Sequence, residues 1–257
     1  MTGNLSEKSN ERTVSPCNPS DCRINGYDVL LVTAAIIIFL AIGIFVVSTV
    51  IAMTVPDMGR LQGLSLGHML LIFSVQVTAI FAAVYLVLQL RKGFAWSDLG
   101  LRPLTRRQLV AAVLVGVVLV AVMEGVERLL GLSVSGLVAH IVAPQGFSWS
   151  GLVGMLLLVG IATPFCEEIF FRSVLYGWMR GRWRPAIAIP ASALVFGLSH
   201  FYYPLPMMLL VAVLGAVFAL AYERSGSLWV PVGIHGAYNS AVVAAIYASL
   251  AMNESAA

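Results

Sequence analysis

Long apolar runs separated by short polar segments dominate this chain. Each run is apolar over about 20 residues, the length that a helix needs to cross a bilayer. We count seven of them, at 29–55, 66–90, 108–126, 150–179, 185–203, 205–222 and 228–251. The pattern predicts an all-α, polytopic membrane bundle of about seven transmembrane helices. A weaker segment at 131–148 is interrupted by glycine and proline, and we expect it to be interfacial or partly re-entrant.

The polar segments divide the chain into three parts. Residues 1–27 form a polar tail that contains two prolines, and we expect it to be a cytoplasmic tail without a cleavable signal peptide. Residues 28–148 hold the first three runs and their loops, and 149–251 hold the last four. Cys17 and Cys22 lie in the tail with no further partners nearby, so their spacing does not predict a zinc site.

Composition supports the membrane interpretation. Hydrophobic residues make up 60% of the chain and charged residues 11%, whereas soluble domains carry about 25% charged residues. Twelve of the fifteen basic residues lie in the tail and in the loops after the second, fourth and sixth runs. This bias predicts a multi-pass protein of the plasma (inner) membrane, with a cytoplasmic N-terminus and an external C-terminus. Too few basic residues remain for nucleic-acid binding.

The stretch CEEIFFRS (166–173) places three charges inside an apolar run. Each charge at mid-bilayer costs about 2.5–3.5 kcal/mol even on a lenient scale. Glu168 and Arg172 are four residues apart, so on a helix they can form an ion pair. Glu167 is rotated by about 100° from Glu168 and is left over for another task. The alternative is that all three charges only hold neighbouring helices together and take no part in catalysis.

Two later runs contain further polar residues. His200 lies near the end of the fifth run, and His235 and Asn239 lie four residues apart in the seventh. At about 1.5 Å per residue, all three can lie at a depth similar to that of Glu167. A carboxylate and an imidazole can remove a proton from water, and a second imidazole and an amide can donate to an oxyanion. We therefore predict amide hydrolysis, with Glu167 and His200 activating water and His235 and Asn239 stabilising the oxyanion.

Two alternatives concern the nucleophile and a metal. Ser199 and Cys166 lie near these groups, but on a helix Ser199 and His200 would diverge by about 100°, which disfavours a serine mechanism. Glu167, His200 and His235 could instead bind zinc, although the HExxH arrangement is missing. We expect no cofactor, with zinc as the alternative. His68 and His140 fall near the outer boundary, and we expect them to be interfacial and inert.

The three motifs together resemble those of the CPBP family of intramembrane proteases, also called the Abi family, which includes the CAAX proteases. The resemblance covers about residues 150–245, with a vaguer likeness at SDLGL (97–101), and rests on Glu167-Glu168-x-x-x-Arg172, Phe196-x-x-x-His200 and His235-x-x-x-Asn239. It implies a four-helix catalytic core within 149–251. By analogy with the Ras-converting branch it implies the same roles for the four predicted catalytic residues, with Glu168 and Arg172 as supporting residues.

The resemblance also implies the class of substrate. We expect a peptide or protein substrate, lipidated or membrane-embedded, and CAAX-type processing is included because one branch cuts after a prenylated cysteine. The other expected partner is the lipid bilayer. A hypothesis from another class is a non-catalytic scaffold, immunity factor or transporter, whose polar groups would bind a ligand or conduct protons.

Overall fold

The computed structural model describes residues 24–54, 64–132 and 134–255, and these residues form helices and connecting turns without a strand. The all-α prediction is therefore confirmed. Most of the predicted tail, with Cys17 and Cys22, lies outside the described residues, as does Arg60.

The first three apolar runs form helices close to their expected bounds. The elements of this part are α1 (Gly26–Thr54), α2 (Leu66–Val84), the π-helical continuation η2 (Tyr85–Leu90), the short 3-10 turn η3 (Trp96–Leu99) and α3 (Arg106–Leu129). Thr105 caps α3, because its side chain accepts from the backbone N–H of Gln108.

The fourth run forms one long central helix that alternates between α and π geometry. Its segments are α5 (Trp149–Met155), η4 (Leu156–Ala162), α6 (Thr163–Glu168), η5 (Ile169–Tyr176) and α7 (Gly177–Arg180). It is preceded by the short α4 (Val134–Val142) and followed by α8 (Pro185–Leu198), α9 (Leu205–Ser225) and α10 (Trp229–Ser255). Local π geometry is frequent at functional sites. Here η4 precedes the CEEIFFRS stretch, and η5 includes the last five residues of that stretch.

Within the described residues, five helices are long and apolar enough to cross a membrane: α1, α2 with η2, α3, the central helix and α9. The other two expected spans, α8 and α10, are not among these five helices, for separate reasons. Helix α8 has only 14 residues, and α10 has 27 residues but carries His235 and Asn239 within its apolar run. The predicted run 185–203 thus ends as a helix at Leu198, five residues early, and turns towards Pro204. A proline disfavours helical backbone at the residue before it.

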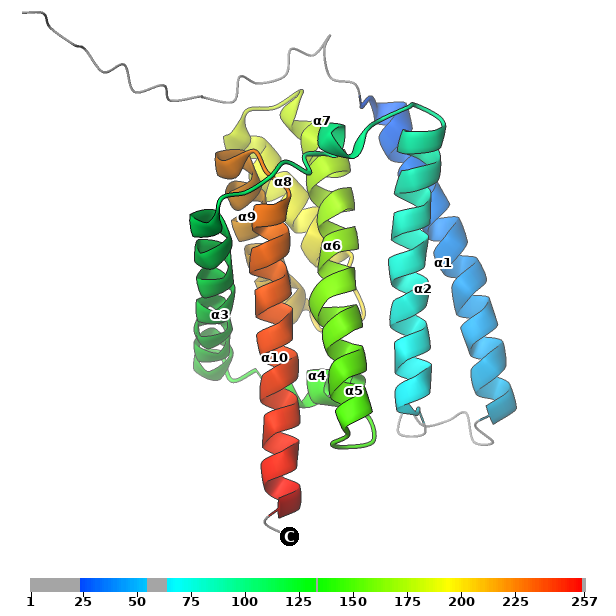
Figure 1. The fold of residues 1–257 in the computed structure, drawn as a ribbon, viewed down its shortest axis with the longest axis vertical. Helices are drawn as coiled ribbons and strands as arrows, with labels where there is room; N and C mark the ends of the chain where they lie inside the picture. The colour runs from blue at the N-terminus through cyan, green and yellow to red at the C-terminus, as the bar shows by residue number, and fades with distance from the viewer. Residues whose placement is uncertain (1–23, 55–63, 133, 256–257) are drawn as a thin grey trace, which may run out of the picture.

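The central helix is surrounded by the rest of the bundle (Figure 1). Helices α1 and α2 pair on one side of it, α3 packs against α10, and α8 packs against α9. Helix α2 contacts η4 and α6, α10 contacts η4 and α6, and α8 and α9 contact η5. The segment with the three charges is therefore enclosed by helices that are distant in sequence.

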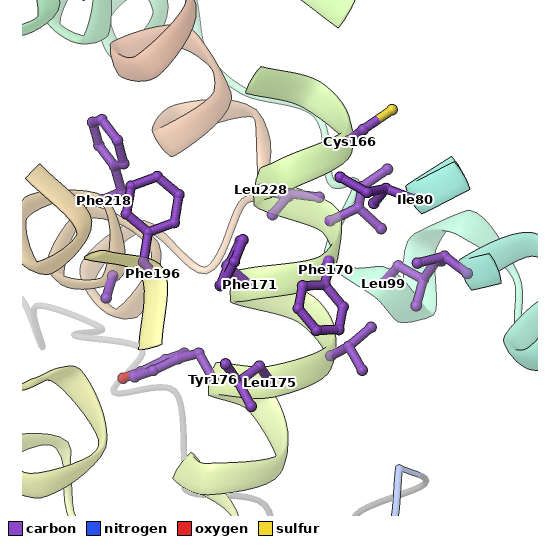
Figure 2. Close-up of a cluster of buried hydrophobic side chains, with 14 of the residues drawn as sticks. Ile80, Leu99, Cys166, Phe170, Phe171, Leu175, Tyr176, Phe196, Phe218 and Leu228 are labelled. Atoms are coloured by element: carbon purple, nitrogen blue, oxygen red, sulfur yellow. The ribbon is translucent and has the colours of Figure 1, made fainter. Parts of the chain in front are cut away.

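A cluster of aromatic and aliphatic side chains fills the space around η5. All eight residues of η5 are buried. Figure 2 shows Phe171 and Tyr176 of the central helix on the same side as Phe196 and Phe218, while Ile80 and Leu99 approach from the other side. By contrast, α1 and α3 expose many large apolar side chains, such as Phe45 and Leu114. Such surfaces suit contact with lipid.

The loop that holds SDLGL crosses one end of the bundle and is anchored by main-chain hydrogen bonds. Ser173 Oγ donates to the carbonyl of Leu99 at 2.5 Å, and Leu228 N donates to the carbonyl of Gly100 at 2.8 Å. Gly100 has a φ of +82°, and any Cβ there would collide with Tyr222. This loop therefore joins η5 to the start of α10.

Helix α4 lies at the opposite end of the bundle (Figure 1). It packs against α2 and α10, and Tyr247 donates its hydroxyl hydrogen to the carbonyl of Val142 at 3.1 Å. A second cluster around Met155 and Val243 supports this end. The position of 131–148 relative to the membrane stays a prediction.

Candidate active site

The three charges of the CEEIFFRS stretch are all buried. Glu167 is 5% exposed, and Glu168 and Arg172 are fully enclosed. Arg172 Nε donates to Glu168 Oε2 at 2.7 Å. The ion pair that the four-residue spacing predicted is therefore confirmed, and Glu167 lies outside it.

The rest of the Arg172 guanidinium group lies among aromatic rings. Its Cζ is 5.0 Å from the ring centroid of Phe196 and 5.8 Å from that of Phe218. The two terminal nitrogens are buried and have no hydrogen-bond partner among the described residues. Cation–π attraction to these rings offsets part of the cost of burying them. Phe196 thus packs against the charge.

Glu168 has a second partner that the sequence analysis missed. Its Oε1 lies 2.9 Å from His235 Nδ1. A carboxylate can only accept, so the hydrogen of this bond belongs to Nδ1 and the neutral imidazole keeps a lone pair on Nε2. The ring of His235 stacks on Phe218 with centroids 4.6 Å apart. Glu168 therefore bridges Arg172 and His235 and orients the imidazole.

Glu167 contacts different groups from those of its neighbour. Its Oε1 accepts a hydrogen bond from Gln76 Nε2 at 2.8 Å, and its Oε2 lies 3.9 Å from His235 Nε2. Among the described residues, no lysine or arginine forms an ion pair with it. Gln76 was also missed by the sequence analysis, although an amide inside an apolar run could have indicated it.

His200 lies in the turn after α8 and is held by the main chain. Its Nδ1 is 2.9 Å from the carbonyl of Phe196, which can only accept, so Nε2 keeps the lone pair of the neutral ring. The ring of Phe196 lies between the two histidines, 5.0 Å from His200 and 5.9 Å from His235. No hydrogen bond or ion pair joins His200 to Glu167 in the described part of the chain.

The two candidate nucleophiles have ordinary structural surroundings. Ser199 Oγ donates to the carbonyl of Phe196 at 2.7 Å and lies 3.3 Å from His200 Nδ1. The expected divergence of Ser199 and His200 is wrong, because both side chains reach back to the carbonyl of Phe196. Cys166 is buried in the apolar cluster (Figure 2).

Asn239 lies one turn after His235 on α10 and reaches the central helix. Its Nδ2 donates to the carbonyl of Val159 at 3.0 Å. Helix α10 and the central helix approach so closely here that any Cβ on Gly160 would collide with Ser240. The amide is therefore held at the same crossing that brings α10 to the glutamates.

The three residues proposed as zinc ligands are not arranged as a ligand set. Glu167 and His235 lie together, whereas Nδ1 of His200 is hydrogen-bonded to the main-chain carbonyl of Phe196. Across the described ranges, no group of three His, Cys, Asp or Glu side chains could hold a metal ion. The zinc alternative stays a prediction that a chelation experiment tests.

Two features at the other end of the bundle lie apart from this site. His68 takes part in the N-cap of α2 with Ser65, and its Nε2 lies 2.9 Å from Thr54 Oγ1. A structural role accounts for this histidine. A cavity of about 340 Å³ also lies there, and none of the predicted catalytic residues lines it. Its lining consists of Leu66, Ala143, Pro144, Gln145, Gly146, Ser148, Ser150 and Tyr247.

Comparisons with known proteins agree with the motif assignment. Residues 149–241 match the family model described as type II CAAX prenyl endopeptidase Rce1-like. This range contains all six predicted site residues. A protein of Bacillus subtilis (strain 168) with the name "Putative membrane peptidase YdiL" is 33% identical over 89 residues, which cover 35% of this chain and 36% of that protein. The match thus spans about a third of the relative's length. No solved structure matches the chain significantly.

Proposed function

We propose that the protein is an intramembrane endopeptidase that hydrolyses a peptide bond with an activated water, since residues 149–241 match the Rce1-like family model. The family consists of membrane peptidases. The observation that carries the proposal is the burial of the Glu167 carboxylate without a cationic partner among the described residues. This carboxylate is buried in the bundle, is not paired with a lysine or arginine among the described residues, and faces an imidazole nitrogen 3.9 Å away. Such burial is expensive and marks functional positions.

In the proposed reaction Glu167 acts as general base and then as general acid. It takes a proton from a water molecule while the water oxygen bonds to the peptide carbonyl carbon. The C–N bond then breaks, and the protonated Glu167 gives this proton to the leaving amine. His200 offers the lone pair of Nε2 as a second acceptor for the same water, since Phe196 holds its Nδ1.

The developing oxyanion needs hydrogen-bond donors. Asn239 can supply one from its amide group, and the imidazolium form of His235, with a hydrogen on each ring nitrogen, can supply another from Nε2. In this proposal the ring takes its extra proton from solvent before the substrate binds and keeps it through the reaction. The Glu168 carboxylate at Nδ1 stabilises that imidazolium form. The positive charge of Arg172 balances the negative charge of the Glu168 carboxylate. The ion pair of Glu168 and Arg172 thereby supports both the fold and the proposed reaction.

We extend the proposal to the substrate class. The matching family model is described by its action on CAAX prenyl substrates, so a lipid-modified or membrane-embedded peptide is the substrate we propose. The exposed apolar surfaces of the bundle would hold the enzyme in the membrane where such substrates lie.

The decisive experiment compares Glu167→Gln with wild type in purified full-length protein in lipid nanodiscs. The assay uses a farnesylated CAAX peptide and an unmodified membrane-spanning peptide, each with a reporter on both sides of the scissile bond. We expect the wild type to cleave at least one peptide and Glu167→Gln to lose about 10²- to 10⁴-fold in rate. Cleavage at the wild-type rate by Glu167→Gln would overturn the mechanism.

Two controls separate the remaining alternatives. Glu124→Gln alters an exposed carboxylate paired with Arg128 and should cleave at the wild-type rate. Treatment with a chelator, followed by addition of zinc, tests the metal alternative. Activity that disappears with the chelator and returns with zinc would contradict the metal-free mechanism. Wild-type protein that binds the peptides but cleaves neither would instead indicate a scaffold.

A further inference from the structure

We propose that Gln76, on a helix outside the family-matched domain, is a positioning residue that orients the Glu167 carboxylate. This inference rests on the proposed function and deepens it. The matched domain covers residues 149–241, so a side chain of α2 would complete a site that the domain alone does not contain.

The placement of Gln76 follows from the buried face of α2. Met69, Ile80 and Ala83 are buried on this helix, and Gln76 follows Met69 by seven residues and precedes Ile80 by four. Residues at these spacings share one helix face. Gln76 is therefore the polar residue on the face of α2 that packs against α6. This position places its side chain next to Glu167.

The hydrogen bond determines which way the carboxylate faces. Gln76 Nε2 donates to Glu167 Oε1 at 2.8 Å, which leaves Oε2 directed towards His235 Nε2. Rotation of the terminal carboxyl group of a glutamate is soft, because this torsion has broad preferences. An amide donor on one oxygen removes that freedom. The other oxygen is then kept in place for the water.

Helix α2 is itself held in place by α1. Val75, the neighbour of Gln76, packs so closely on α1 that any Cβ on Gly43 would collide with it. Helix α2 also contacts η4 and η5 of the central helix. The helix pair thus holds the amide on a fixed support, as the orientation of a catalytic group requires.

The same run offers a matched control. Gln89 lies in η2, thirteen residues further on, and its Nε2 is buried but has no hydrogen-bond partner among the described residues. Gln76 and Gln89 therefore share residue type and span, and they differ in contact with Glu167. A methionine at either position keeps nearly the same side-chain length and removes the amide.

The kinetic test uses full-length protein with the peptide that the wild type cleaves. We expect Gln76→Met to lower kcat by about 10- to 100-fold with KM within about twofold, as misplacement of a catalytic group does. Gln76→Asn should recover part of the rate, because it keeps the donor, and Gln89→Met should match the wild type. Equal rates for Gln76→Met and Gln89→Met, or a change confined to KM, would overturn the proposal.

A spectroscopic test does not depend on turnover. The infrared spectrum of protein with ¹³C-labelled glutamate, minus that of labelled Glu167→Gln, isolates the carboxyl band of Glu167. We expect Gln76→Met to shift this band and Gln89→Met to leave it unchanged. An unshifted band contradicts the positioning role even in an active enzyme. A shifted band in a protein that cleaves nothing supports the contact and contradicts the proposed function instead.

Discussion

Buried carboxylates occur in two regions of this molecule, and their surroundings differ. At the end of the bundle that carries the basic loops, Asp28 is 1% exposed and lies 2.7 Å from Lys92 Nζ and 3.3 Å from Arg91. Glu223 is only partly buried, at 25% exposed, and accepts from Tyr176 and Arg180. In the middle of the bundle, Glu167 is held by one amide and faces one imidazole. Carboxylates paired with cations stabilise the fold, whereas a carboxylate without such a partner is suited to proton transfer.

Glu168 shares properties with both regions. It is neutralised by Arg172 in the same way that Asp28 is neutralised by Lys92, yet its other oxygen orients His235. A charge pair inside the bundle can therefore stabilise helices and position a catalytic group at once. The following changes test this division between structural and chemical carboxylates.

The largest effect on stability is expected from Glu168→Gln. The change leaves Arg172 buried without its counter-charge, and breaking a buried pair costs about 3–5 kcal/mol. Glu167→Gln should unfold close to the wild type, because Glu167 forms no ion pair with a lysine or arginine. Unfolding by denaturant in detergent micelles measures both. Equal destabilisation by the two variants would remove the distinction between the neighbouring glutamates.

The double change Glu168→Leu with Arg172→Leu should be milder than Glu168→Gln in stability. Replacing a buried pair with apolar residues of similar volume is often neutral or stabilising by about 1–4 kcal/mol. Cleavage should still be lost, because His235 has no carboxylate at Nδ1. A double-mutant cycle by unfolding, together with the peptide assay, checks both points. An active double variant would show that Glu168 serves the fold alone.

Asp28→Asn is expected to lower stability by about 1.5–3 kcal/mol, the contribution of hydrogen bonds to a charged group. Arg91 is about half exposed, at 48%, and Lys92 is 26% exposed, so both cations can regain water. The cleavage rate should stay at the wild-type value. A loss of rate without a loss of stability would connect this end of the bundle to catalysis.

The smallest effect is expected from Glu124→Gln on α3. Its partner Arg128 is four residues away, and both side chains are largely exposed. Such helix pairs contribute about 0.3–0.5 kcal/mol. The unfolding midpoint in micelles should therefore change little. If Glu124→Gln lowered stability as much as Asp28→Asn does, solvent exposure would not explain the difference between an exposed ion pair and a buried one.

Features set by local spacing could be predicted from the sequence. Apolar run length located the helices within a few residues, and the four-residue spacing of Glu168 and Arg172 predicted their ion pair. The early end of α8 at Leu198 was missed, because aromatic residues continue the run after Ser199 and His200 as far as Pro204. The roles assigned to His200, His235 and Asn239 stay predictions that the peptide assay tests.

The sequence by itself determined the all-helical membrane architecture, the three motifs and the one pair within a helical turn. The tertiary structure alone decided that Glu168 meets His235 across 67 residues and that Gln76 meets Glu167 across 91. The reason is geometric. Each residue turns a helix by about 100°, so the side chains that meet depend on how neighbouring helices are rotated and how closely they cross. Packing contacts such as Gly160 against Ser240 set those rotations, and no local pattern reports them.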